Sequence, residues 1–274
     1  VVAGWQPAVG LYKFSSSGDL QWKKTGSDWP GLSDGDWWNQ SFSSNPDYKL
    51  TDDNKGIDID NSGNIYIADY YNDRIIKLDS SGNFLTEFEV DGQGSLNSIA
   101  VDNNDGSMYV AHNMDHYVKK FDAAGNFVAQ QYAYANPADV AVDESGNVYF
   151  TATKGNGAGT HQVRIYSDFE NGVLAAKIGN GQSDCSIYQG CLTGGSNWTS
   201  NILEEGDFYQ PGSVVAKNGK LYVGDGNGIH VFNVNIPPPV NLSFESLDIT
   251  TSSGGTTLSP GEFWYITPTL TWEG

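Results

Sequence analysis

Histidines and loop aspartates are the residues of this chain that could hold a metal ion. Imidazole nitrogens suit zinc, and carboxylate oxygens suit calcium. However, the spacing does not fix three histidines around one point, and no twelve-residue calcium loop occurs. We therefore expect no cofactor and treat the histidines as turn or surface residues, with calcium as a weak alternative. The residues concerned are His112, His116, His161, His230, Asp69, Asp73, Asp115 and Asp225.

Aromatic residues in loops offer a second chemistry, the recognition of sugar rings or of a protein surface. The long segment 26–55 carries several of them among glycines and aspartates. The alternative is that its tryptophans fold back as a lid and form a small core of their own. The ligand-binding candidates are Trp29, Trp37, Trp38, Tyr48, Tyr70, Tyr71, His112 and His116.

The overall charge limits the classes of partner that the protein is expected to bind. The 33 acidic residues outnumber the 14 basic ones, for a net charge of −19. This field repels phosphate backbones and anionic lipids, so we expect neither nucleic acid nor a bare membrane as a partner. No apolar run approaches the roughly 20 residues that span a bilayer. No G-x-S-x-G, H-E-x-x-H or phosphate loop occurs, so we expect no enzyme; a metal-dependent lyase or lactonase stays an alternative.

Two features favour an extracellular, oxidising location. The only cysteines, Cys185 and Cys191, flank a short loop that a disulfide could close. Three N-x-S/T triplets also fall in predicted loops or a linker, where a glycan could attach. These glycosylation candidates are Asn39, Asn197 and Asn241.

The elements that position these residues repeat about every forty residues. Equivalent tyrosines mark the phase: Tyr66 and Tyr109 are 43 residues apart, Tyr149 follows after 40, and Tyr222 after one period plus an insertion. Short strands and glycine turns at such a period predict a radial all-β architecture, a β-propeller. We expect about five four-stranded blades, with four or six as alternatives.

The second repeat serves as the template. Its first strand alternates isoleucine with aspartate and is expected to bury the isoleucine face, and the apolar run 65–68 predicts a strand covered on both faces. Glycine turns separate the strands. The predicted strands are 56–60, 65–68, 74–78 and 84–88, then 99–102, 108–111, 117–121 and 127–131, then 140–143, 148–151, 163–166 and 173–178.

The two ends supply partial units. The N-terminal stretch is expected to contribute only a final hairpin, and the last repeat three strands. We interpret these partial units as strands that close the ring, or as the ends of a piece of a longer array. The predicted strands are 11–14 and 20–24 at the start, and 214–216, 221–224 and 229–234 at the end.

The phrase GIDIDNSGNIYIADYYNDRIIKLD, which begins at Gly56, resembles an NHL repeat. The resemblance covers roughly residues 10–235 and implies a propeller whose first strand in each blade is the inner one. It also implies that Asp69, Asn72 and Arg74 mostly shape the blade. The third repeat departs from the pattern at this corner, where it has His112, Asp115 and Tyr117.

The tail forms a separate segment. A proline-rich linker, 236–240, follows the predicted propeller of residues 1–235. Residues 241–274 contain two alternating strands, 242–249 and 263–272, and resemble the opening of a CARDB domain, an Ig-like adhesion module. Two strands cannot bury a core. The segment is therefore either part of a longer surface protein or a hairpin that docks on the propeller or on a neighbouring subunit by strand addition.

Together these observations predict a non-catalytic extracellular or cell-surface protein for adhesion, binding or filament assembly. Its partners would be another protein or identical subunits, with glycans as an alternative.

Overall fold

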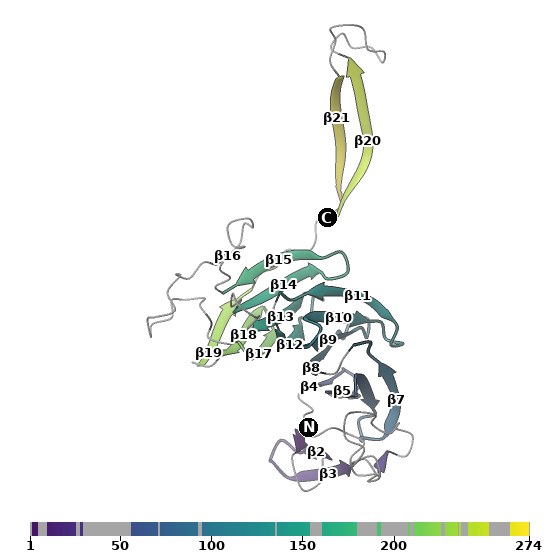
Figure 1. Cartoon of the computed structure of the whole chain (residues 1–274), viewed down its shortest axis with the longest axis vertical. Helices are drawn as coiled ribbons and strands as arrows, with labels where there is room; N and C mark the ends of the chain where they lie inside the picture. Colours follow the sequence, from purple (N-terminus) through teal and green to yellow (C-terminus); the bar gives the residue numbers. More distant parts are fainter. Residues whose placement is uncertain are drawn as a thin grey trace. The chain divides into compact units, whose positions relative to one another are not determined.

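The computed structural model describes residues 2–4, 10–25, 28–29, 56–70, 72–92, 95–134, 136–153, 161–179, 191–192, 208, 211–225, 228–234, 236, 241–251 and 264–273. All regular elements among them are strands, which confirms the all-β prediction (Figure 1). Contacts divide the chain into two units, Val1–Ile236 and Pro237–Gly274. In this part of the chain no helix has the length and apolarity to cross a membrane.

The second repeat forms one antiparallel sheet with the order β4-β5-β6-β7. The central strand β5 is buried along its whole length, as the apolar run predicts. One tight turn connects β4 to β5, and another connects β6 to β7. In the first, Asp60 accepts the backbone N–H and the side-chain amide of Asn64, each at 2.8 Å, and Gly63 adopts φ +81°. The strands are β4 (Gly56–Ile59), β5 (Ile65–Asp69), β6 (Arg74–Leu78) and β7 (Phe84–Glu89).

The third and fourth repeats build equivalent sheets, and the last repeat a three-stranded one. Their strands lie where the sequence predicts them, within a few residues. They are β8 (Leu96–Val101), β9 (Met108–His112), β10 (Tyr117–Phe121), β11 (Phe127–Tyr132), β12 (Asn136–Val142), β13 (Val148–Thr153), β14 (Gln162–Asp168), β15 (Val173–Ile178), β17 (Ser213–Lys217), β18 (Lys220–Asp225) and β19 (Gly228–Asn233).

Two short strands are absent from the sequence-based prediction. At the N-terminus, β1 (Val2–Gly4) pairs with β2 (Gly10–Phe14), so that with β3 (Leu20–Thr25) the expected hairpin becomes a three-stranded sheet. In the insertion, β16 (Cys191–Leu192) pairs in parallel with β15. Strands of two or three residues are too short to show a period of two, which is why the pattern does not reveal them.

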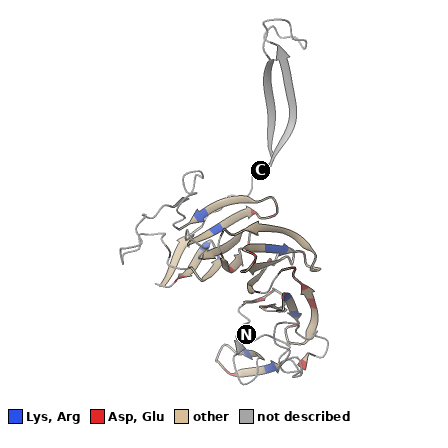
Figure 2. Ribbon diagram, viewed as in Figure 1, with Lys and Arg blue, Asp and Glu red and all other residues tan. Residues whose placement is uncertain are grey.

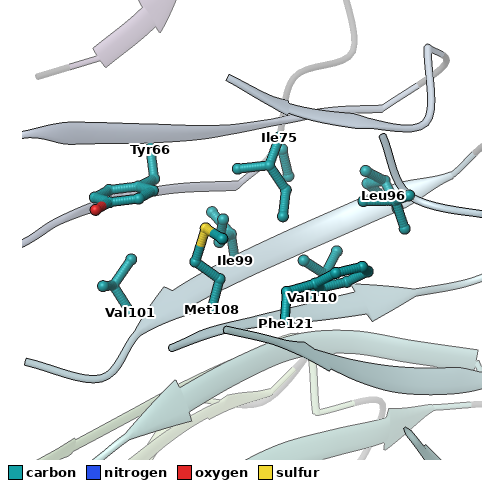
Figure 3. Packing of buried hydrophobic residues seen from close by; sticks show 10 residues of the cluster. Tyr66, Ile75, Leu96, Ile99, Val101, Met108, Val110 and Phe121 are labelled. Atoms are coloured by element: carbon teal, nitrogen blue, oxygen red, sulfur yellow. The ribbon is translucent and has the colours of Figure 1, made fainter. Parts of the chain in front are cut away.

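Successive sheets pack face to face through apolar side chains. The first strands of consecutive repeats, β4, β8, β12 and β17, are neighbours in that order. Between β4–β7 and β8–β11, the core contains Tyr66, Ile75, Leu96 and Phe121, with Met108 and Val110 between them (Figure 3). Similar clusters join the other sheets. Because the second, third and fourth repeats are covered by neighbouring sheets, they are blades of the β-propeller type, with four antiparallel strands each.

The marker tyrosines occupy equivalent places. Tyr66, Tyr109 and Tyr149 are each the second residue of the second strand of a sheet, and each is buried against the next sheet. In the register they face Asp58, Ala100 and Ala141 of the first strands. The forty-residue period therefore corresponds to one blade.

One expectation about the first strand is wrong. The alternation predicts that Ile57 and Ile59 are buried and that Asp58 is exposed, but Ile59 is 42% exposed. Asp58 instead accepts a hydrogen bond from the Val101 N–H of the adjacent strand β8 at 2.8 Å. The neighbouring blade, rather than solvent, lies beside this carboxylate.

The second unit is a single antiparallel pair, β20 (Asn241–Thr251) and β21 (Trp264–Glu273), in ten register pairs. The register places uncharged, mostly apolar residues opposite one another at alternate pairs, such as Leu242 with Trp272 and Ile249 with Ile266. Polar pairs, such as Ser246 with Thr269, alternate with them. In residue types and register, the pair therefore has the pattern of an amphipathic ribbon, in which mostly apolar and polar pairs alternate.

Candidate functional site

The loop between β5 and β6 is held by a buried ion pair. Asp69 Oδ2 accepts hydrogen bonds from Arg74 Nε at 2.9 Å and from Asn72 Nδ2 at 2.8 Å. Arg74 Nη1 also donates to Glu87 Oε2 at 2.8 Å. Asp69 is fully buried, and its carboxylate is paired with a cation of its own sheet. This geometry agrees with a residue that shapes the corner of a blade.

In the third repeat, His112 occupies the position equivalent to Asp69. Its ring is fully buried and lies between two carboxylates, with Nε2 3.6 Å from Asp73 Oδ1 and Nδ1 3.6 Å from Asp115 Oδ2. The Asp115 N–H points at Nδ1 from 3.4 Å, which favours the tautomer with its proton on Nε2. Gly92 packs directly against the ring, because a Cβ there would lie 2.1 Å from Nε2.

Lys119 completes this corner. Its ammonium donates to Asp115 Oδ2 at 2.9 Å and to the carbonyl oxygen of Asp91. The corner thus joins loops of two blades through His112, Asp73, Asp115 and Lys119. Within it, the Lys119 ammonium neutralises the Asp115 carboxylate.

The other predicted histidines do not join this corner through any described interaction. His116 packs edge-to-face on Tyr132, and His161 is buried. His230 Nε2 lies 3.1 Å from Asp225 Oδ2, and Asp225 Oδ1 also accepts the Gly228 N–H. Within the described residues, no group of three or more His, Cys, Asp or Glu is arranged to hold a metal ion.

Only some residues of the predicted aromatic site lie among those that the structure describes. Trp29 is fully buried beside Leu11, Ile65 and Ile67, and its Nε1 donates to the Gly82 carbonyl oxygen at 2.8 Å. It is therefore a core residue and not a surface ring. Tyr70 is half-buried, and its carbonyl oxygen accepts the Ser95 N–H. Outside the described residues lie Trp37, Trp38, Tyr48, Tyr71, Cys185, Asn39 and Asn197; Cys191 and Asn241 lie in β16 and β20.

A groove of about 700 Å³ is lined by residues of β7, β10 and β11 and of adjacent turns. It combines the exposed ring of Phe127 with carboxylates, and it shares Lys119 and Asp91 with the His112 corner. The sequence-based candidates do not include this groove. Its lining residues are Glu89, Asp91, Lys119, Phe121, Gly125, Phe127, Ala129, Gln130 and Glu170.

The sequence analysis also missed a line of polar contacts along the first strands. Asp139 on β12 accepts the Val214 N–H of β17 at 2.8 Å and the hydroxyl of Ser98 on β8. Burial raises the pKa of Asp139 and of Asp58 above the ordinary value of 3.8. Both carboxylates connect consecutive blades. An aspartate within a strand that otherwise reads as buried is the sequence signal that could have identified them.

Basic residues lie within strands, as Lys119 and Lys120 do on β10 and Arg164 on β14, whereas many aspartates lie at turns (Figure 2). Lys120 donates to Glu170 Oε1 of the next blade at 2.8 Å, and its ammonium lies over the Tyr109 ring. Burial alone would lower the pKa of Lys120, but the hydrogen bond to Glu170 and the contact with Tyr109 raise it. Lys120 thus neutralises an acid of the next blade.

These features define an all-β protein with four-stranded antiparallel blades of the β-propeller type. No protein-family model matches the chain, and no curated protein matches it either. The NHL and CARDB resemblances therefore stay predictions. Among solved structures, hydrazine synthase of Kuenenia stuttgartiensis is similar, with 12% identity and a TM-score of 0.44 over 76% of this chain. The match spans 56% of that structure's chain.

Proposed function

We propose that this chain is a non-catalytic, extracellular or cell-surface β-propeller protein that acts in adhesion, binding or surface assembly. In this proposal the blades are a rigid body and the tail ribbon is the attachment element. The cysteine pair and the three glycosylation triplets support the location.

The amphipathic ribbon of β20 and β21 is the observation that carries the proposal. An isolated two-stranded sheet is marginally stable at best, because it can bury neither its apolar face nor its outer edges. Among the described residues, each of these strands pairs only with the other. A partner sheet that covers the apolar face, or a strand that pairs with an edge, would remove both costs. The partner is a neighbouring subunit or another surface protein.

The test compares substitutions on the two faces of the ribbon in the full chain. Leu270→Asp and Ile249→Asp change the apolar face, and Thr269→Asp is the matched control on the polar face. We expect light scattering to show concentration-dependent association of the unmodified chain and of the control. The apolar-face variants should associate at least about tenfold more weakly, because a charge is placed in a desolvated contact. Equal association of all three variants would contradict the proposal.

A further inference from the structure

The last sheet, β17–β19, has an exposed apolar face. Val215, Tyr222 and Val231 are register partners across its three strands, so they form one row. Their exposed fractions are 54%, 38% and 53%, and Ile229 beside them is 76% exposed. The opposite face carries Val214, Leu221 and Val223, which are buried in the contact with the preceding blade.

The repeat shows what this face is built to contact. The equivalent rows are Asp58–Tyr66–Lys77, Ala100–Tyr109–Lys120 and Ala141–Tyr149–Ile165. In each of these rows the tyrosine is at most 3% exposed, because the following blade covers it. Tyr222 occupies the same position, and its row contains no charged residue. A row of this composition matches a blade interface and not a solvated surface.

The first sheet, β1–β3, carries the complementary surface. Tyr12, Phe14 and Leu20 are equivalent to Ile76, Leu78 and Phe84, which pack on the preceding blade. Phe14 and Leu20, which are register partners, are 44% and 55% exposed. Lys23 lies over the Tyr12 ring on the same face. The sheet β1–β3 thus carries a face that fits a preceding blade, and the sheet β17–β19 carries a face that fits a following blade.

The Tyr222 face consists of Val215, Tyr222 and Val231, and the Phe14 face consists of Tyr12, Phe14 and Leu20. We infer that the Tyr222 face of one copy docks on the Phe14 face of a second copy, in the manner of two consecutive blades. A second copy is the occupant because both faces are exposed together within one chain, so they do not cover each other there. The contact is head-to-tail, and such contacts generate rings or open filaments. The inference deepens the proposed assembly function, on which it rests, by naming a second contact and its partner.

Charged substitutions in the full chain test the contact. We expect Tyr222→Lys or Phe14→Lys to raise the dissociation constant measured by sedimentation at least about thirtyfold, as the loss of a central interface residue does. Val231→Lys repeats the test on the same row. Leu85→Lys, at a position 50% exposed on β7, is the matched control and should associate like the unmodified chain.

A mixture of variants tests the head-to-tail geometry. The Tyr222→Lys chain keeps its Phe14 face, and the Phe14→Lys chain keeps its Tyr222 face. The mixture should therefore form a one-to-one dimer that grows no further. A mixture that stays monomeric overturns the inference, and so does association of either variant alone at the unmodified strength. A third outcome also overturns the inference. If the unmodified chain is a monomer, and both substitutions lower its stability without changing its mass, the two faces contact each other within one chain.

All measurements are repeated with Leu270→Asp, which removes the apolar ribbon contact. Association that persists there and disappears with Tyr222→Lys supports the blade contact even if the ribbon proposal fails. Association that disappears with Leu270→Asp but is unchanged by Tyr222→Lys supports the ribbon alone and overturns the blade contact.

Discussion

The Asp58 carboxylate on β4 accepts the backbone N–H of Val101 on β8 at 2.8 Å, so one side chain joins the inner strands of two consecutive blades. Two blades further along, Asp139 makes a similar bond to the Val214 N–H, although Asp139 lies two residues before the position equivalent to Asp58. Burial raises the pKa of both carboxyl groups. These bonds satisfy backbone donors that the neighbouring strand cannot pair within its own sheet.

Replacing Asp58 by alanine should destabilise the protein by about 1–3 kcal/mol, because the buried Val101 N–H loses its acceptor. Alanine itself fits the strand, since Ala100 and Ala141 occupy the equivalent positions. Asp58→Asn keeps an oxygen and should cost less. Urea unfolding at neutral pH measures these differences, with the exposed Asp91→Ala as control. Equal stability of the Asp58→Ala and Asp91→Ala variants would refute this role.

The raised pKa of Asp139 predicts a pH dependence. Because the folded-state pKa lies above the ordinary 3.8, this carboxyl favours the folded state below that pH, and its contribution declines as pH rises through the folded-state pKa. Asp139→Asn removes the ionisation, and its amide can donate to Ser98. Relative to the unmodified protein, the variant should gain stability from about pH 4 upward. Unfolding series at several pH values test this, and a parallel pair of curves would exclude it.

The turn aspartates should behave in the opposite way. Hydrogen bonds from the Asn83 backbone and side chain lower the pKa of Asp79. Its contribution is therefore present above about pH 4 and is lost as pH falls through the lower folded-state pKa. Asp79→Ala should cost about 1 kcal/mol at neutral pH and less in acid. The same unfolding series measures it, and a loss that grows as pH falls would be the wrong sign.

At Gly56 on β4, the backbone lies close to the backbone of β8 in the next blade. A Cβ there would lie 2.6 Å from the Ser98 Cα, so Gly56→Ala must move one blade against the next. We expect a loss of about 1–3 kcal/mol or more. Gly18→Ala is the contrast, since nothing lies within 4 Å and only the positive φ of +88° is unfavourable, at about 1 kcal/mol. A larger loss at Gly18 than at Gly56 would contradict this view of the blade contact.

The cysteine pair gives a prediction about location. In protein secreted through an oxidising compartment, non-reducing peptide mapping should find Cys185 linked to Cys191. Closing so short a loop should stabilise the protein by about 2 kcal/mol in the chain-entropy model. Cys185→Ser together with Cys191→Ser, compared by thermal unfolding, measures the effect. Two unmodified thiols in secreted protein would argue against the predicted disulfide.

Much of the fold could be predicted because its signals are local. The apolar run Ile65–Ala68 and the turn glycine Gly63 each act within a few residues, and the structure places β5 and its turn there. The candidate site was less predictable. The sequence left open whether Trp29 is an exposed ring or part of a small core of its own, and the structure places it in the core of the blades. Asp58 reads as solvent-facing but bonds to the next blade.

By itself, the sequence determined the period, the strand positions and the repeated blade, because period-two alternation and turn chemistry depend on neighbours in the chain. The tertiary structure alone decided which faces are covered. Tyr66 and Tyr222 have the same place in their repeats, yet the first is buried and the second is 38% exposed. Burial depends on the adjoining sheet, and that sheet comes from residues distant in sequence.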